Sequence, residues 1–164
     1  LDFTWSWRLP GKEEMRLATR KLSDGVGVEV LGLDVRASID DDTRSVLTAL
    51  FIEAGVLLFR GAGVSPEAHL NLSRCFGALE RHSVKESWTE GCPELIDISY
   101  RPPAPGAQST TQPIYSLNGE TLAGWLPWHT DQCFMAKLSR GGVLRAVQVP
   151  SRRGRTGFID KIRL

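Results

Sequence analysis

The 164-residue sequence predicts an α+β chain with a mainly β core. Two amphipathic helix patterns lie in its first half, and apolar runs typical of strands lie around and after them. The sequence shows no internal repeat and no heptad pattern. Its length suits one domain over residues 1–164 and is too short for two ordinary domains.

The first three elements are predicted from residue periodicity and from end signals. Valine alternates with glycine over residues 25–33, which indicates a strand. The carboxylates of residues 40–42 can cap exposed amide groups and precede apolar residues at helical spacing, so we expect a helix over residues 41–54. Gly55 should end that helix. Residues 56–59 are all apolar and bounded by glycines, which is typical of a strand buried on both faces.

A second helix is expected to begin at Ser65, with Pro66 in its first position, and to end at Gly77. Later strands are expected over residues 95–100, 143–149 and 156–159. Residues 101–127 are rich in proline and glycine. A connection of that length is usually either a functional lid or disordered, and we interpret it as a candidate lid loop.

Charge and composition narrow the class of partner. Twenty basic and nineteen acidic side chains give a net charge of +1, so no broad field favours nucleic acid or an anionic membrane. The apolar run at residues 54–59 is too short to span a bilayer, and the first residues lack a signal-peptide pattern. Widely spaced Cys75, Cys92 and Cys133 favour reduced thiols. We therefore expect a cytoplasmic protein with a small-molecule partner and no nucleic acid or membrane, with homo-oligomerisation left open.

The segment around His129 and Asp131 carries the strongest chemical signal. If it is extended, residues two apart share one face of the strand, so these two side chains would point together while Thr130 turns away. An imidazole and a carboxylate on one face form part of a facial triad, which suits Fe(II) because three coordination positions stay open. The alternative is a histidine hydrogen-bonded to a neighbouring carboxylate. Cys133 continues the alternation, and we expect it to pack nearby rather than bind the metal.

Several motifs occur in order from about residue 25 to residue 160. They comprise Gly27-Val28-Glu29-Val30, Gly55-Val56-Leu57-Leu58-Phe59-Arg60-Gly61, Phe76-Gly77-Ala78-Leu79, Trp128-His129-Thr130-Asp131 with Phe134, and Pro150 followed by Thr156, Phe158 and Asp160. Because it has these motifs in this order, the chain resembles the taurine dioxygenase-like (TauD/TfdA) family of iron(II)/2-oxoglutarate oxygenases. Together the motifs are far more specific than His-x-Asp alone.

The resemblance implies a double-stranded β-helix (jelly-roll) core with flanking helices. It implies that His129 and Asp131 bind iron and that Thr156 helps to hold 2-oxoglutarate, unless Thr156 is an ordinary strand threonine. His82 and Trp125 would face the substrate, although an exposed loop histidine and a buried aromatic residue would explain them as well. The implied reaction uses Fe(II), 2-oxoglutarate and O2 to hydroxylate an unactivated C–H bond of a small molecule, and it releases succinate and CO2.

The sequence departs from the family pattern after the iron segment. Such enzymes need a second histidine as third ligand and a later arginine for the distal carboxylate of 2-oxoglutarate. Only 33 residues follow Asp131, none of them histidine, and Arg163 comes too soon after Thr156. We therefore expect the amino-terminal portion of an oxygenase domain, incomplete at its carboxyl end. Two other functions stay open: a non-catalytic binding protein of the same fold, and a zinc-dependent hydrolase that adds a ligand such as Cys133.

Overall fold

The computed structural model describes residues 2–8, 14–83, 85–98, 114–123, 127–152 and 154–162. Contacts divide the chain into two compact units. The first consists of Leu1–Glu80 with Arg140–Leu164, and the second of Arg81–Ser139. Within the described ranges, no helix is both long and apolar enough to cross a membrane.

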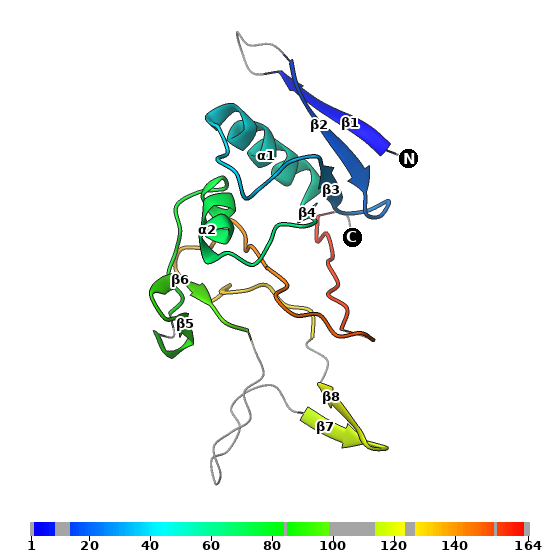
Figure 1. Ribbon diagram of the computed structural model, residues 1–164, viewed down its shortest axis with the longest axis vertical. Helices are drawn as coiled ribbons and strands as arrows, with labels where there is room; N and C mark the ends of the chain where they lie inside the picture. Colours follow the sequence, from blue (N-terminus) through cyan, green and yellow to red (C-terminus); the bar gives the residue numbers. More distant parts are fainter. Residues whose placement is uncertain are drawn as a thin grey trace. The chain divides into compact units, whose positions relative to one another are not determined.

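A four-stranded sheet organises the first unit (Figure 1). Its strands are β1 (Asp2–Arg8), β2 (Glu14–Lys21), β3 (Val28–Leu31) and β4 (Leu57–Phe59), in that spatial order. The first two pairings are antiparallel, whereas β3 and β4 are parallel. Parallel neighbours need a crossover connection, and helix α1 (Asp41–Ala54) supplies it.

Local signals set the bounds of α1, as the sequence predicts. The Asp40 carboxylate accepts a hydrogen bond from the backbone N–H of Thr43 at 2.7 Å, so it caps the amino end. Gly55 adopts a φ of 72° at the other end, and its N–H donates to the carbonyl oxygen of Phe51. A positive φ favours glycine, which explains why the helix stops there.

Helix α2 (Pro66–Arg74) begins where expected and ends earlier than expected. The Ser65 hydroxyl accepts from the N–H of Ala68 at 3.4 Å, and proline occupies the first turn. The helix stops before Gly77 because the two N–H groups that follow Arg74 bond to carbonyl oxygens three residues back, which tightens the last turn.

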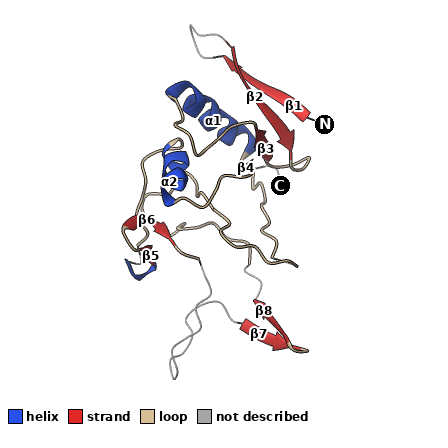
Figure 2. Ribbon diagram, in the orientation of Figure 1, coloured by secondary structure: helices blue, strands red, loops and turns tan. Residues whose placement is uncertain are grey.

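Both helices, drawn in blue in Figure 2, and the centre of the sheet, drawn in red, contribute to one core. Its buried members come from β3, α1, α2 and the loops beside them: Val30, Val35, Ile39, Leu47, Leu50, Leu72 and Cys75. Leu47 and Leu50 are 0% and 1% exposed. Burial of branched side chains on this scale is the main stabilising contribution to the unit.

A buried carboxylate lies on β3 within this sheet. The Glu29 side chain is 5% exposed and forms ion pairs with Arg20 (Nη2 to Oε2, 2.6 Å) and Arg60 (Nε to Oε1, 3.1 Å). The hydrogen bond from Arg20 is the main reason that the pKa of Glu29 lies below its usual value. Two arginines therefore keep this carboxylate ionised inside the sheet.

The second unit contains two hairpins. Strand β5 (Trp88–Thr89) pairs with β6 (Cys92–Ile96), and β7 (Ile114–Leu117) pairs with β8 (Glu120–Ala123). A short 3-10 turn, Lys85–Ser87, precedes β5. The predicted strand 95–100 starts earlier, because pairing with β5 extends β6 back to Cys92, and it ends at Ile96 among the described residues; residues 99–100 lie outside them. Leu95 is 8% exposed, whereas Ile98, beyond the strand, is 75% exposed.

The predicted lid at residues 101–127 contains regular structure. Residues 114–123 form the hairpin β7–β8, and its turn residues Asn118 and Gly119 both have positive φ, 52° and 78°. Such residues suit a tight hairpin turn. Residues 101–113 and 124–126 lie outside the described part of the chain.

Three further strand predictions need correction. Residues 143–149 and 156–159 are described, and neither range forms a strand. A strand needs a neighbour that pairs with its backbone groups, and no described strand pairs with either range. The residues of β4 are half-buried rather than buried on both faces, because the core against which Leu57 and Phe59 pack covers them only in part. The described chain is mainly β with few helices, while the jelly roll stays a prediction.

Candidate metal centre

His129 and Asp131 lie in an irregular segment of the second unit, not on the predicted strand. The chain turns immediately after His129: Gln132 has a φ of 52°, and its carbonyl oxygen accepts from the N–H of Met135 at 3.0 Å. The two side chains nevertheless converge, with Nε2 of His129 2.9 Å from Oδ1 of Asp131. The strand prediction is therefore wrong, while the two side chains do face each other as expected.

A backbone carbonyl fixes the orientation of the imidazole. Nδ1 of His129 lies 2.8 Å from the carbonyl oxygen of Pro127. A carbonyl oxygen only accepts hydrogen bonds, so Nδ1 carries the hydrogen and donates it. The nitrogen directed at Asp131 is then Nε2. A histidine whose second nitrogen donates to a carbonyl is the usual arrangement in metal sites, because that bond sets both the tautomer and the ring direction.

The pKa of His129 is raised above its usual value. The hydrogen bond to the Pro127 carbonyl is the largest cause, and the nearby Asp131 carboxylate adds to it. The side chains of His129 and Asp131 are 50% and 81% exposed, so water and ions reach both. Without a metal, the pair is a hydrogen-bonded histidine and carboxylate, which is the alternative that the sequence left open.

The distance between the two side chains fits two neighbouring ligands of one metal ion. Ligand atoms that each lie about 2.1 Å from a metal, at roughly a right angle, stand about 3 Å apart. The 2.9 Å between Nε2 and Oδ1 meets that requirement. Across the described residues, however, no group of three His, Cys, Asp or Glu side chains could hold an ion, and Cys133 is an exposed free thiol. Among the described residues, the His129–Asp131 pair has the spacing of two ligands and has no third side chain of this kind beside it.

His82, the expected substrate residue, is held in a small cluster of the second unit. Its Nδ1 lies 3.2 Å from the hydroxyl oxygen of Ser87, and its carbonyl oxygen accepts from Nε1 of Trp88 at 2.9 Å. The Arg81 guanidinium lies 5.7 Å from the ring centroid of Trp88 and 3.3 Å from an oxygen of Glu94. His82 is half-buried and lies outside the helices and strands, and its contact with a substrate stays a prediction.

The structure gives less information about the other two predicted site residues, Thr156 and Trp125. Thr156 is exposed and lies in an irregular stretch of the first unit. Trp125 lies outside the described residues. Their proposed contacts with 2-oxoglutarate and with substrate therefore stay predictions.

Sequence reasoning missed a structural role for His69 in the first unit. His69 belongs to α2, within the helix that the sequence predicts from Ser65 onwards. Its Nε2 lies 2.9 Å from the carbonyl oxygen of Val143, and Arg145 donates to the carbonyl oxygen of Val64 at 2.6 Å. These bonds hold residues 143–145 beside α2, and the sequence carries no signal for them because the partners are distant along the chain.

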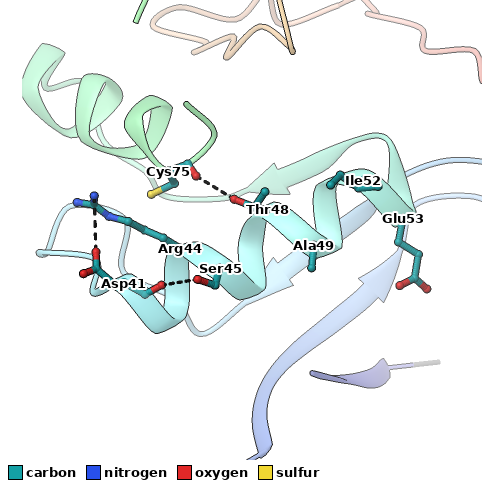
Figure 3. Close-up of a pocket in the computed structure, with 8 residues that line it drawn as sticks. All are labelled: Asp41, Arg44, Ser45, Thr48, Ala49, Ile52, Glu53 and Cys75. Atoms are coloured by element: carbon teal, nitrogen blue, oxygen red, sulfur yellow. Dashed lines mark hydrogen bonds and ion pairs between the residues drawn. The ribbon is translucent and has the colours of Figure 1, made fainter. Parts of the chain in front are cut away.

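A groove of about 830 Å³ runs along the outer face of α1 (Figure 3). Its hydroxyl groups serve the protein's own backbone: Ser45 donates to the carbonyl oxygen of Asp41 at 2.8 Å, and Thr48 donates to that of Cys75 at 2.9 Å. Arg44 lies 3.9 Å from the Asp41 carboxylate. These side chains form no nucleophile–base or metal-binding arrangement, so the candidate centre remains the pair at His129 and Asp131.

Comparisons with known proteins agree with the motif order. The family model described as taurine catabolism dioxygenase TauD, TfdA family matches residues 18–163. An (S)-phenoxypropionate/alpha-ketoglutarate-dioxygenase from Delftia acidovorans is 28% identical over 136 residues, which is 82% of this chain and 43% of that protein. Pentalenolactone F synthase from Streptomyces avermitilis is 30% identical over 148 residues, covering 87% and 44%.

A third relative is the alpha-ketoglutarate-dependent 2,4-dichlorophenoxyacetate dioxygenase from Cupriavidus pinatubonensis, 30% identical over 138 residues and covering 82% and 46%. The chain thus spans less than half the length of each of these curated relatives. The family match includes the whole segment from β3 to the His129–Asp131 pair and beyond it to Thr156. This chain belongs to the TauD/TfdA dioxygenase family.

Proposed function

We propose that this chain contributes His129 and Asp131 as iron ligands to an Fe(II)- and 2-oxoglutarate-dependent dioxygenase. The reaction we propose is hydroxylation of an unactivated C–H bond in a small molecule, with release of succinate and CO2. The observation that carries the proposal is the 2.9 Å approach of Nε2 to Oδ1, with Nδ1 engaged by the Pro127 carbonyl. The same proposal includes a jelly-roll core, which requires further strands besides the described ones.

Each proposed residue has a distinct task. The Pro127 carbonyl orients His129 so that Nε2 is the ligand atom, and the Asp131 carboxylate adds a negative charge and an oxygen ligand. The Thr156 hydroxyl helps to hold 2-oxoglutarate, and His82 and Trp125 contact the substrate. Bound iron supplies the activation of O2 and the oxidation of the C–H bond.

The proposed substrate class stays broad because the relatives differ. Two of them are named for phenoxypropionate and 2,4-dichlorophenoxyacetate, and another for pentalenolactone F. The first two molecules are both aryloxyalkanoates, whereas the third is named as a lactone, so the names together support a small organic substrate and no narrower class. The hairpin β7–β8 is the described part of the predicted lid. We propose that this hairpin closes over the substrate.

Anaerobic metal binding together with succinate release tests this function. We expect the protein to bind Fe(II), and we expect His129→Ala and Asp131→Ala each to weaken that binding at least about tenfold, because each removes a ligand. His82→Ala is the matched control, since it removes a histidine of the same unit outside the pair and should keep the iron affinity.

The products of the assay separate the three candidate functions. Iron binding with 2-oxoglutarate-dependent succinate release supports the oxygenase. Tight zinc binding with hydrolysis and no succinate would support the zinc hydrolase instead. Equal iron affinity in the native protein and both ligand variants, without succinate, would contradict the proposal and leave the non-catalytic binding protein.

A further inference from the structure

Strand β1 presents an unpaired edge. It pairs with β2 along its whole length, from Asp2 opposite Arg20 to Arg8 opposite Glu14, without a register shift (Figure 1). Among the described strands, none pairs with its other edge. An open edge of this kind is a template for another strand, and proteins usually blunt it with proline, charge, a bulge or a very short strand.

The interior of β1 contains none of these protections. This interior, residues 3–7, has no proline, no glycine and no charged residue. By contrast, the opposite edge of the same sheet, β4, has only three residues and is followed at once by Arg60. The open edge of β1 is therefore the one suited to a partner strand.

The residue types of β1 are complementary to themselves in one antiparallel register. If two copies pair about Trp5, acidic and basic ends meet and aromatic residues stand opposite aromatic residues. The opposed positions are Asp2 with Arg8 of the second copy, Phe3 with Trp7, Thr4 with Ser6, and Trp5 with itself. Opposite charges and aromatic pairs across two strands each stabilise the pairing.

Other registers lose this match. Parallel pairing in register would set Asp2 beside Asp2 and Arg8 beside Arg8, which places like charges together. A slip of one residue in either direction would set two of the aromatic residues against Thr4 or Ser6 and the third against Asp2 or Arg8. The antiparallel register about Trp5 also has the two-fold symmetry that closes a dimer.

We propose that β1 pairs with β1 of a second copy of this chain and forms a two-fold dimer with one continuous sheet. The interface lies outside residues 18–163, the part that the family model matches, so it is a property of this chain beyond the family core. It does not depend on the proposed iron chemistry, and its test is independent of metal.

Two double variants give a matched test of the pairing. Thr4→Lys/Ser6→Lys sets lysine opposite lysine twice across the two-fold axis, whereas Thr4→Glu/Ser6→Lys sets glutamate opposite lysine. Within the hairpin both variants place lysine opposite Arg16 and differ only opposite Ala18. Far-UV circular dichroism checks that both variants keep the native fold, in which case a difference in association reports the contact between copies.

Sedimentation equilibrium measures the outcome. We expect the native chain, of 18.1 kDa, to reach twice that mass as concentration rises. The double-lysine variant should dimerise at least about tenfold more weakly than the glutamate–lysine variant. A native protein that stays monomeric at all concentrations overturns the proposal. Equal dimerisation of the two variants overturns it as well, because the dimer would then form through another surface.

Discussion

Two histidines that each bond a backbone carbonyl have pKa shifts of opposite sign. Burial lowers the pKa of His69, the nearby Arg145 lowers it further, and the bond to the Val143 carbonyl only partly offsets these effects. The pKa of His129 is raised, mainly by its bond to the Pro127 carbonyl. The same contact therefore has different consequences at a half-buried helix face and in an exposed loop.

The lowered pKa of His69 predicts a loss of stability in acid. Between its folded and unfolded pKa values the unfolded chain binds more protons, so the His69 contribution is present above about pH 6.5 and is lost as the pH falls. We expect His69→Gln, whose amide can still donate to Val143, to change the free energy of unfolding at about pH 7.5 by less than about 1 kcal/mol. It should also flatten the decline between about pH 7.5 and pH 5.5.

Urea unfolding at several pH values measures this slope in the native chain and in the variant. An identical decline in both proteins would show that His69 is not the group responsible. A loss of several kcal/mol already at neutral pH would show that glutamine cannot replace the bond to Val143.

At the residue scale, the sequence predicted pairs of close residues better than distant ones. His129 and Asp131 are two residues apart, so their convergence could be predicted even though the strand that was expected to cause it is not present. The partners of Glu29, Arg20 and Arg60, lie 9 and 31 residues away. These charges come together only through the register of β2, β3 and β4, and that register cannot be predicted from the spacing of residues in the sequence.

At the element scale, the helices could be predicted because their end signals are local. Asp40 and Gly55 flank α1, and both signals act within one turn of the helix. The apolar run at residues 143–149 has the periodicity of a strand, yet pairing depends on a neighbour elsewhere in the chain. Leu144, Val147 and Val149 are 64%, 65% and 71% exposed there. Periodicity alone therefore could not identify this range as irregular.

The carboxyl end of α1 gives the prediction at this scale. Gly55 has a φ of 72°, which L side chains rarely adopt, so Gly55→Ala should lower the free energy of unfolding by about 1 to 2 kcal/mol. Gly25→Ala is the matched control, since Gly25 has no positive φ and a methyl group added there would meet no atom within 4 Å. The control should stay within about 0.5 kcal/mol of the native chain.

Thermal and urea unfolding compare the two glycine variants. A cost at Gly55 no greater than that at Gly25 would contradict the role assigned to the positive φ. Reduced backbone freedom in the unfolded chain would raise the stability of both variants, so that effect cannot be the cause of a cost at Gly55.

At the scale of the whole molecule, the buried core and the candidate iron ligands lie in different units. The buried cluster joins β3, α1 and α2 in the first unit, whereas the His129–Asp131 pair lies in the second. The family match covers both, although the chain spans less than half the length of its relatives. A change in the core should therefore alter stability without altering the residues that are proposed to bind iron.

Leu47 and Ile52 test this division on one helix. Leu47 is 0% exposed in the core, so Leu47→Ala should lower the free energy of unfolding by about 2 to 5 kcal/mol through lost burial and the cavity left behind. Ile52 is 74% exposed on the same helix, and Ile52→Ala should cost less than about 0.5 kcal/mol. Urea unfolding gives both values, and Fe(II) binding at low temperature should be unchanged in either variant while it is folded. Equal costs at the two positions would contradict the core, and a loss of iron affinity in folded Leu47→Ala would contradict the separation of stability from metal binding.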